Sequence, residues 1–202
     1  MNPFAHGNWN GQSTSVYGAL PSLAAPATQL DTVTYTFMNF KSTILNSTIV
    51  GPDGRTAYTV STEANAPAYT IFKDTEKRNI GMVQWQPYAS VEIRGGSTRQ
   101  RVRDWLRLSS DQSRRIMEAN RVQYAWAPMD GFVCLYKMHS SAPRILGRVS
   151  RSPTAVSLEL TAEAVQLGLT EPALVATAML SSGHNIDRAH RSAAPILLLL
   201  LS

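Results

Sequence analysis

TEPALVATAMLSSG, residues 170–183, is the stretch of this sequence that decides the fold. It opens with a capping threonine, an acid and a proline, which are signals of a helix start, and Gly183 stands where a helix commonly stops. Between these signals, residues 173–180 are apolar on almost every face of the expected helix. Such a helix must be buried or lie in a membrane, and about 12 residues at 1.5 Å each are too few to span a bilayer. We therefore expect it to run through the core.

The sequence before this helix is rich in strand signals. Residues 32–37, TVTYTF, alternate in the way expected of a half-buried strand. The β-prone runs 44–50 and 56–61 flank GPDGR at 51–55, whose proline and glycines suit a hairpin turn. Strands this dense, with no long amphipathic helix between them, indicate antiparallel pairing in a barrel or a sandwich. Similar runs predict strands at 69–73, 79–86, 90–94, 100–106, 122–126, 132–138, 144–150 and 155–160, and residues 113–120 are read as a turn or a short strand.

Length and composition fit one globular domain with two loose ends. The chain has 202 residues, of which 44% are hydrophobic and 16% are charged, a balance that favours a folded core. Residues 1–29 carry no charged side chain and are expected to form a flexible leader, followed by the folded domain over 30–187. The tail, 188–202, contains an apolar run at 196–201 that is far shorter than the roughly 20 residues of a transmembrane helix.

The N-terminus indicates where the protein works. It lacks the basic start and the continuous apolar segment of a secretory signal peptide. We therefore expect an intracellular, cytoplasmic protein with no transmembrane segment; a peripheral position at a membrane and a nuclear position are the alternatives.

Four short strings stand in a fixed order along the chain: TIVGPDGRTAY at 48–58, VQW at 83–85, VRDWL at 102–106 and YAW at 124–126. With the apolar helix behind them, they resemble the tubby C-like superfamily, with its LURP-one and scramblase-like members, in an uncharacterised fungal branch. The resemblance covers about residues 30–187. It implies a mainly β (α+β) fold, an antiparallel closed β-barrel around a buried apolar C-terminal helix. Related branches include tubby proteins that bind phosphoinositides, phospholipid scramblases and plant proteins linked to defence, and the family implies no catalytic residues.

The region from Arg94 to Arg121 is the best candidate site. It holds eight arginines and only three acids. The forked guanidinium suits phosphate, and strand alternation would place Arg99, Arg101 and Arg103 on one face. The alternative is an ordinary solvated outer face of the domain. The residues predicted to bind lipid or phosphate are Arg94, Arg99, Arg101, Arg103 and Arg107.

An anionic phospholipid or phosphoinositide head group is the expected partner of these arginines. The formal net charge of +5 and the pI of about 9.6 favour acidic partners in general. Nucleic acid is the second choice, with Trp105 and Tyr124 as stacking platforms, although core packing also explains both aromatic residues. A protein partner stays open as well, with the apolar run at 196–201 as part of the contact surface.

Motifs for catalysis or metal binding are missing from the sequence. Cys134 is the only cysteine, and its apolar neighbours indicate a small buried hydrophobe rather than a nucleophile. Ser181 and Ser182 do not stand in a nucleophile elbow, and the histidines lack the spacing of a metal site. We therefore expect no catalytic residue, no metal and no cofactor, and we read the chain as a non-catalytic binding module. A protein-interaction or scaffold subunit and an unrecognised enzyme are the alternatives. The histidines are His6, His139, His184 and His190.

Overall fold

The structure is a computed structural model that describes residues 31–40, 43–63, 68–95, 97–138 and 144–187. Within these ranges it contains thirteen strands, all joined in one antiparallel sheet, and three helices. The described part of the chain is therefore mainly β. The leader expected at 1–29 and the tail expected at 188–202 lie outside the described residues.

The first seven strands pair with one another in sequence order. The turn predicted at 51–55 joins the second strand to the third: the N–H of Gly51 donates to the carbonyl of Arg55 at 2.8 Å. Gly54 has a φ of 74°, a conformation that glycine adopts without strain. The hairpin predicted there is confirmed. The strands are β1 (Thr32–Met38), β2 (Ser47–Val50), β3 (Thr56–Glu63), β4 (Tyr69–Asp74), β5 (Asn79–Gln84), β6 (Ser90–Ile93) and β7 (Ser97–Arg101).

The second half contains the remaining six strands and all three helices. The predicted Asp130–Gly131 turn joins two of these strands, and both residues have positive φ values, 50° and 81°, as in a tight hairpin turn. Residues 115–119 of the ambiguous 113–120 segment form a strand. The elements are α1 (Val102–Trp105), β8 (Leu106–Leu108), β9 (Arg115–Ala119), β10 (Val122–Met129), β11 (Phe132–Lys137), β12 (Ile145–Arg151), β13 (Val156–Thr161), α2 (Ala162–Gln166) and α3 (Thr170–Ser181).

The sheet is open, so the predicted closed β-barrel is wrong. The strand order is β7-β6-β5-β4-β3-β2-β1-β13-β12-β11-β10-β9-β8. β1 connects the two halves, because it pairs with β2 on one side and with β13 on the other, from Thr32 opposite Thr161 to Phe37 opposite Val156. β7 and β8 are the two edges of this sheet.

Residues 102–105 lie between the two edge strands, where the sheet is interrupted. A continuous strand over 100–106 was predicted, but β7 ends at Arg101 and the chain then forms α1. Val102 and Trp105 stand at i and i+3, which places them on one face of this helical turn. Both are buried, and so is Leu106 at the start of β8. The indole N–H of Trp105 donates to the carbonyl of Glu118 in β9 at 3.1 Å. A closed barrel would need β7 and β8 to pair with each other, but the chain is helical between them and no ladder joins these two strands.

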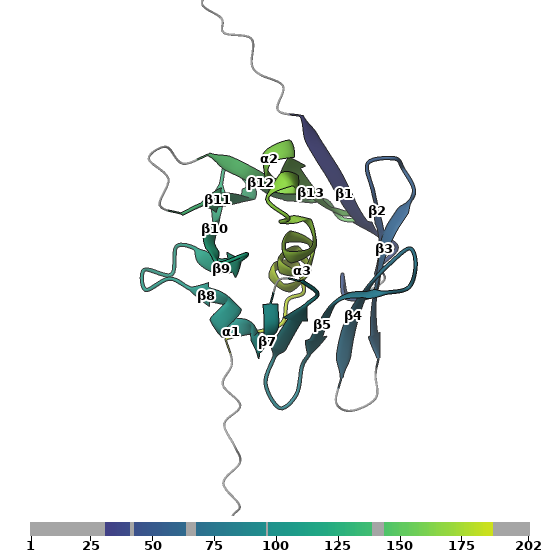
Figure 1. Ribbon diagram of the computed structural model, residues 1–202, viewed down its shortest axis with the longest axis horizontal. Helices are drawn as coiled ribbons and strands as arrows, with labels where there is room; N and C mark the ends of the chain where they lie inside the picture. Colours follow the sequence, from purple (N-terminus) through teal and green to yellow (C-terminus); the bar gives the residue numbers. More distant parts are fainter. Residues whose placement is uncertain (1–30, 41–42, 64–67, 96, 139–143, 188–202) are drawn as a thin grey trace, which may run out of the picture. The chain divides into compact units, whose positions relative to one another are not determined.

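α3 lies in the space that the curved sheet surrounds (Figure 1). Eight consecutive residues of this helix, 172–179, are buried. β5 approaches the helix closely: a Cβ at Gly81 would lie 2.9 Å from Cγ2 of Val175, closer than real side chains come. Glycine at this position therefore lets the helix and the sheet pack against each other.

The core is continuous across both halves of the sheet. Phe37 and Phe72 from the first half and Trp126 and Leu158 from the second belong to one buried cluster, which also includes α3. None of the helices in the described ranges is long and apolar enough to cross a membrane.

Candidate functional site

Four of the five predicted binding arginines lie along the interruption between the two sheet edges. Arg99 and Arg101 belong to β7, Arg103 to α1 and Arg107 to β8. Because α1 has only four residues, about 6 Å at 1.5 Å per residue, the end of β7 and the start of β8 stay close together. We call these four residues the seam arginines.

Three of the seam arginines, Arg99, Arg101 and Arg107, are exposed on the outer side of the sheet. Arg99 and Arg101 are two residues apart in a strand and both are exposed, so they share one face. Arg107 is exposed next to the buried Leu106, which places it on the outer face of β8. The prediction that Arg103 continues the face of Arg99 and Arg101 is wrong, because the backbone is helical there. The side chain of Arg103 is 38% exposed.

The seam arginines have few charged or aromatic partners among the described residues. Nε of Arg103 lies 3.8 Å from Oδ1 of Asp104, whose side chain is 62% exposed, and such exposed pairs contribute little. The guanidinium of Arg101 lies 4.4 Å from the ring centroid of Tyr88, itself 43% exposed. No described carboxylate lies within ion-pair distance of Arg99 or Arg107. Phosphate groups could therefore reach these side chains.

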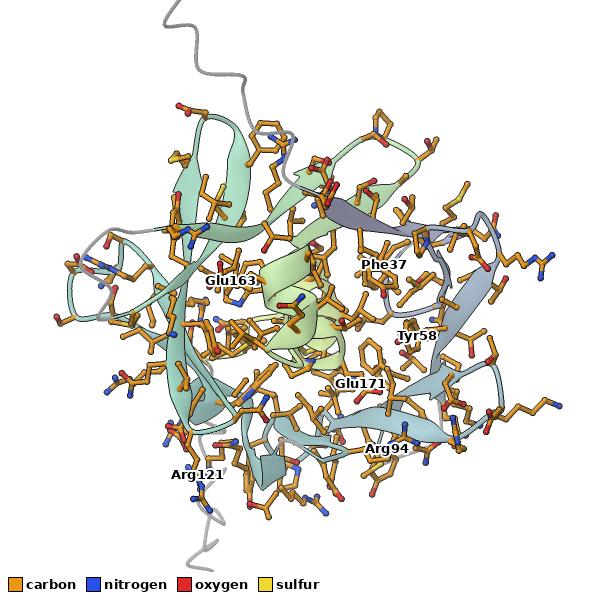
Figure 2. The ribbon with its side chains drawn as sticks, turned by 45° about the horizontal axis from the view of Figure 1, so that its top comes forward. Phe37, Tyr58, Arg94, Arg121, Glu163 and Glu171 are labelled. Atoms are coloured by element: carbon orange, nitrogen blue, oxygen red, sulfur yellow. The ribbon has the colours of Figure 1, made fainter. Side chains whose placement is uncertain are left out.

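Arg94, the fifth predicted arginine, directly follows β6 and makes contacts that the seam arginines do not share. Its Nη2 atom is 3.7 Å from Oδ2 of Asp74 and 3.6 Å from Oε1 of Glu171. Figure 2 shows Arg94 on the same side of α3 as Glu171 and Tyr58, whereas Arg121 lies in a different part of the molecule. The structure thus divides the arginine-rich stretch between two sites.

Arg94 and Glu171 line a cleft of about 560 Å³ at the N-terminal end of α3. We call it the polar cleft; Tyr35, Tyr58, Asp74 and Arg78 also line it. The sequence gives no sign of this cleft, because its residues are spread from position 35 to position 171 and meet only through the sheet topology. The local sequence around Glu171 indicates the start of a helix but no binding site.

Burial shapes the electrostatics of the polar cleft. It raises the pKa of Glu171, whose side chain is 29% exposed, despite the nearby Arg94. Burial, together with the nearby Tyr35, Glu171 and Asp74, raises the pKa of Tyr58 to about 12. Desolvation acts in the same direction on Asp74, but hydrogen bonds from Arg78 outweigh it and lower the pKa of that carboxyl. The Tyr58 hydroxyl is therefore protonated, and a donor, at neutral pH.

A second cleft, of about 520 Å³, lies at the other end of α3 and has aromatic walls. The rings of Trp85 and His184 stack there with their centroids 4.3 Å apart. The indole N–H of Trp85 donates to Oγ1 of Thr70 at 2.8 Å. Tyr88 also lines this cleft and contacts Arg101, so the aromatic walls adjoin the seam arginines.

The described residues hold no group of three or more His, Cys, Asp or Glu that could bind a metal ion. Cys134 is 1% exposed, and burial raises the pKa of its thiol, so the prediction of a small buried hydrophobe is confirmed. Ser182 donates from its hydroxyl to the carbonyl of Met179 and accepts from the N–H of His184, which makes it part of the helix end. His6, His139 and His190 lie outside the described residues.

Comparison with known protein families matches residues 42–180 to a family of unknown function (DUF6593). The match covers more than half of the chain. Searches of curated proteins and of solved structures found no match. These comparisons do not link the chain to the tubby C-like superfamily, so that resemblance stays a prediction.

Proposed function

Because the chain belongs to the DUF6593 family, whose function is unknown, we propose a role for it from its own surface. It is a non-catalytic binding module that docks on anionic phospholipid or phosphoinositide head groups through the seam arginines. The observation that carries this proposal is the exposure of Arg99, Arg101 and Arg107 around one short interruption of the sheet.

The chemistry of the seam arginines suits a phosphate-bearing surface. Each guanidinium offers a planar fork of donors that matches phosphate oxygens. A basic side chain near an anionic bilayer contributes about 1 kcal/mol, so several together give appreciable binding without a deep pocket. Charges on edge strands also prevent edge-to-edge aggregation, a role that is compatible with membrane docking.

Tyr88 adds a second feature that favours a membrane interface. It is 43% exposed and lies against Arg101, and aromatic rings beside cations are typical of the level of lipid head groups. The resemblance to a superfamily with phosphoinositide-binding members points to the same class of ligand.

The end of the described chain also lies close to the seam arginines. Arg115 of β9 forms a double contact with Asp187, at 3.0 and 2.6 Å, and donates to the carbonyl of Leu106 at 3.0 Å. Residue 187 is therefore fixed beside β8, next to Arg107. The sequence that follows it contains the apolar run 196–201, and an apolar segment combined with basic residues strengthens interfacial binding.

Co-flotation with vesicles tests this proposal. Phosphatidylcholine vesicles with increasing phosphatidylserine are mixed with the full chain at about 50 mM and about 500 mM salt, because salt screens exposed charges. In the test variant Arg99, Arg101 and Arg107 are changed to Gln. At about 1 kcal/mol per arginine, we expect it to bind roughly 100-fold more weakly at low salt. A further arm replaces phosphatidylserine by a phosphoinositide at equal total charge.

The control variant changes Arg55, Arg144 and Arg151 to Gln, three exposed arginines outside the seam arginines. It has the same net charge as the test variant, since three positive charges are removed from +5 in each, which leaves +2. We expect it to keep most of the binding. Equal losses in both variants would show that net charge alone attracts the protein and would reject a defined docking face.

Absence of vesicle binding under every condition would overturn the proposal in favour of a protein partner. The outer face of β10–β12 then becomes the best candidate contact, because it holds a hollow of about 810 Å³ lined by Pro128, Met129, Tyr136 and Ile145.

A further inference from the structure

The polar cleft takes no part in the proposed membrane docking and has the dimensions of a ligand site. Its volume of about 560 Å³ falls within the range of about 300–1,000 Å³ that is typical of small-molecule pockets. Its side chains come from β1, the β2–β3 turn, β3, the end of β4 and the turn after it, the segment after β6 and the first turn of α3. Several elements of the fold therefore hold them in place.

Asp74 organises one wall of the polar cleft. Its Oδ1 atom accepts from the backbone N–H groups of Glu76 at 3.0 Å and Arg78 at 2.9 Å. Its Oδ2 atom accepts from Nε of Arg78 at 2.8 Å. Both oxygens of the Asp74 carboxylate therefore already accept hydrogen bonds within the β4–β5 turn, and these bonds hold the Arg78 side chain beside the cleft. Asp74 thus has a structural role.

Arg94 and Glu171 keep hydrogen-bonding capacity for a ligand. The contacts of Arg94 with Asp74 and Glu171, at 3.7 and 3.6 Å, are ion pairs longer than a normal N–H···O hydrogen bond of about 2.7–3.2 Å. The guanidinium can therefore still donate and the Glu171 carboxylate can still accept. The hydroxyl of Tyr58 adds a further donor and acceptor in the same cleft.

The charges that line the polar cleft nearly cancel. Arg78 and Arg94 face the carboxylates of Asp53, Asp74 and Glu171. For an anion such as phosphate, attraction by the arginines is offset by repulsion from the carboxylates, and for a simple cation the two effects are reversed. A neutral ligand that both donates and accepts hydrogen bonds meets neither penalty.

We propose that the polar cleft binds a neutral sugar. Sugar hydroxyls can accept from Arg94 and donate to Glu171 at the same time, which satisfies both side chains without adding charge. Tyr35 and Tyr58, whose ring centroids are 6.1 Å apart, supply apolar ring surface for the C–H groups of the sugar. None of the seam arginines lines this cleft, so the proposal does not depend on membrane docking.

Ligand-observed NMR and calorimetry on the full chain test the proposal. The probes are glucose, galactose, mannose and N-acetylglucosamine, each to about 20 mM, a concentration that detects even weak binding. Inorganic phosphate serves as the ionic probe. We expect at least one sugar to bind and phosphate not to compete with it.

Matched variants locate the bound sugar. Glu171→Gln and Arg94→Gln should each weaken binding roughly tenfold or more, because each removes a charge-assisted hydrogen bond. The controls are Glu163→Gln and Arg121→Gln, which change the same residue types away from the polar cleft (Figure 2). Glu163 stands in the first turn of α2 as Glu171 does in α3, so the helix position is matched. We expect sugar binding to both controls to stay within about twofold, since they remove no contact with the ligand.

Two results would overturn the proposal: no sugar binds at these concentrations, or a sugar binds equally well to Glu171→Gln and Arg94→Gln. Vesicle binding of Glu171→Gln is measured in parallel and should equal that of the wild type. Failure of sugar binding therefore leaves the membrane-docking proposal unaffected, and failure of vesicle binding leaves the sugar site unaffected.

Discussion

Glu171 is a carboxylate that the fold holds in the first turn of α3 with less water around it than a surface acid has. A helix N-terminus favours a negative charge, but burial outweighs this effect and the nearby Arg94, and the pKa of Glu171 rises. The folded protein therefore holds a proton on this residue at pH values where the unfolded chain has lost it.

This shift makes stability depend on pH. Because the folded state binds the extra proton, stability falls as pH rises from the ordinary carboxyl pKa of 4.5 through the raised value. Glu171→Gln removes this fall in stability, because glutamine does not ionise. Thermal unfolding should show the variant matching the wild type at pH values below the ordinary pKa and exceeding it at neutral pH. A variant that is less stable than the wild type at neutral pH would contradict the assignment, and Glu163→Gln is the control.

The spacing of the arginines predicts a shared strand face correctly for some of them and not for others. Alternation correctly placed Arg99 and Arg101 on one strand face, because β7 is extended there. Arg103, two residues further along, does not continue this face, because its backbone is helical. Side chains at every second position share a face only while the backbone is an extended strand.

At the scale of elements, the contact between β5 and α3 depends on Gly81. A methyl group at this position would lie 2.9 Å from Cγ2 of Val175, so the helix or the strand would have to shift. We expect Gly81→Ala to lower the free energy of unfolding by about 1–3 kcal/mol in urea titrations, the usual effect of overpacking.

Val175→Ala provides the control for Gly81→Ala, because it removes the atom that the new methyl group would meet. The double variant should recover part of the stability expected from the sum of the two single changes, as it does for residues in contact. Strict additivity would show that Gly81 and Val175 do not limit the approach of the helix.

Some elements could be predicted from local sequence and others could not. The hairpins around residues 51–55 and 130–131 have turn residues whose conformational preferences act within four or five positions. α1 is a single turn, and only the i, i+3 spacing of Val102 and Trp105 indicates it. The polar cleft has no local signal, because Arg94 and Glu171 meet only after β6 and α3 take their places.

At the scale of the whole molecule, the open sheet distinguishes this chain from the predicted closed barrel. Closure would have removed both edges, whereas the structure leaves β7 and β8 as edges and places arginines on each. The interruption at α1, which the sequence did not predict, thus lies at the centre of the proposed docking face. None of the seam arginines lines the polar cleft, so the two proposals rest on different residues.

Backbone hydrogen exchange of the full chain, with and without phosphatidylserine vesicles, tests membrane docking most directly. Amides at the open edge of β7 exchange readily in the free protein, because an edge strand presents unpaired N–H groups to water. If the seam arginines dock on the bilayer, exchange should slow across residues 97–108 with anionic vesicles and not with neutral ones, and residues 53–58 of the polar cleft should not change. Protection that is absent from 97–108, or that is strongest over 125–145, would contradict the account.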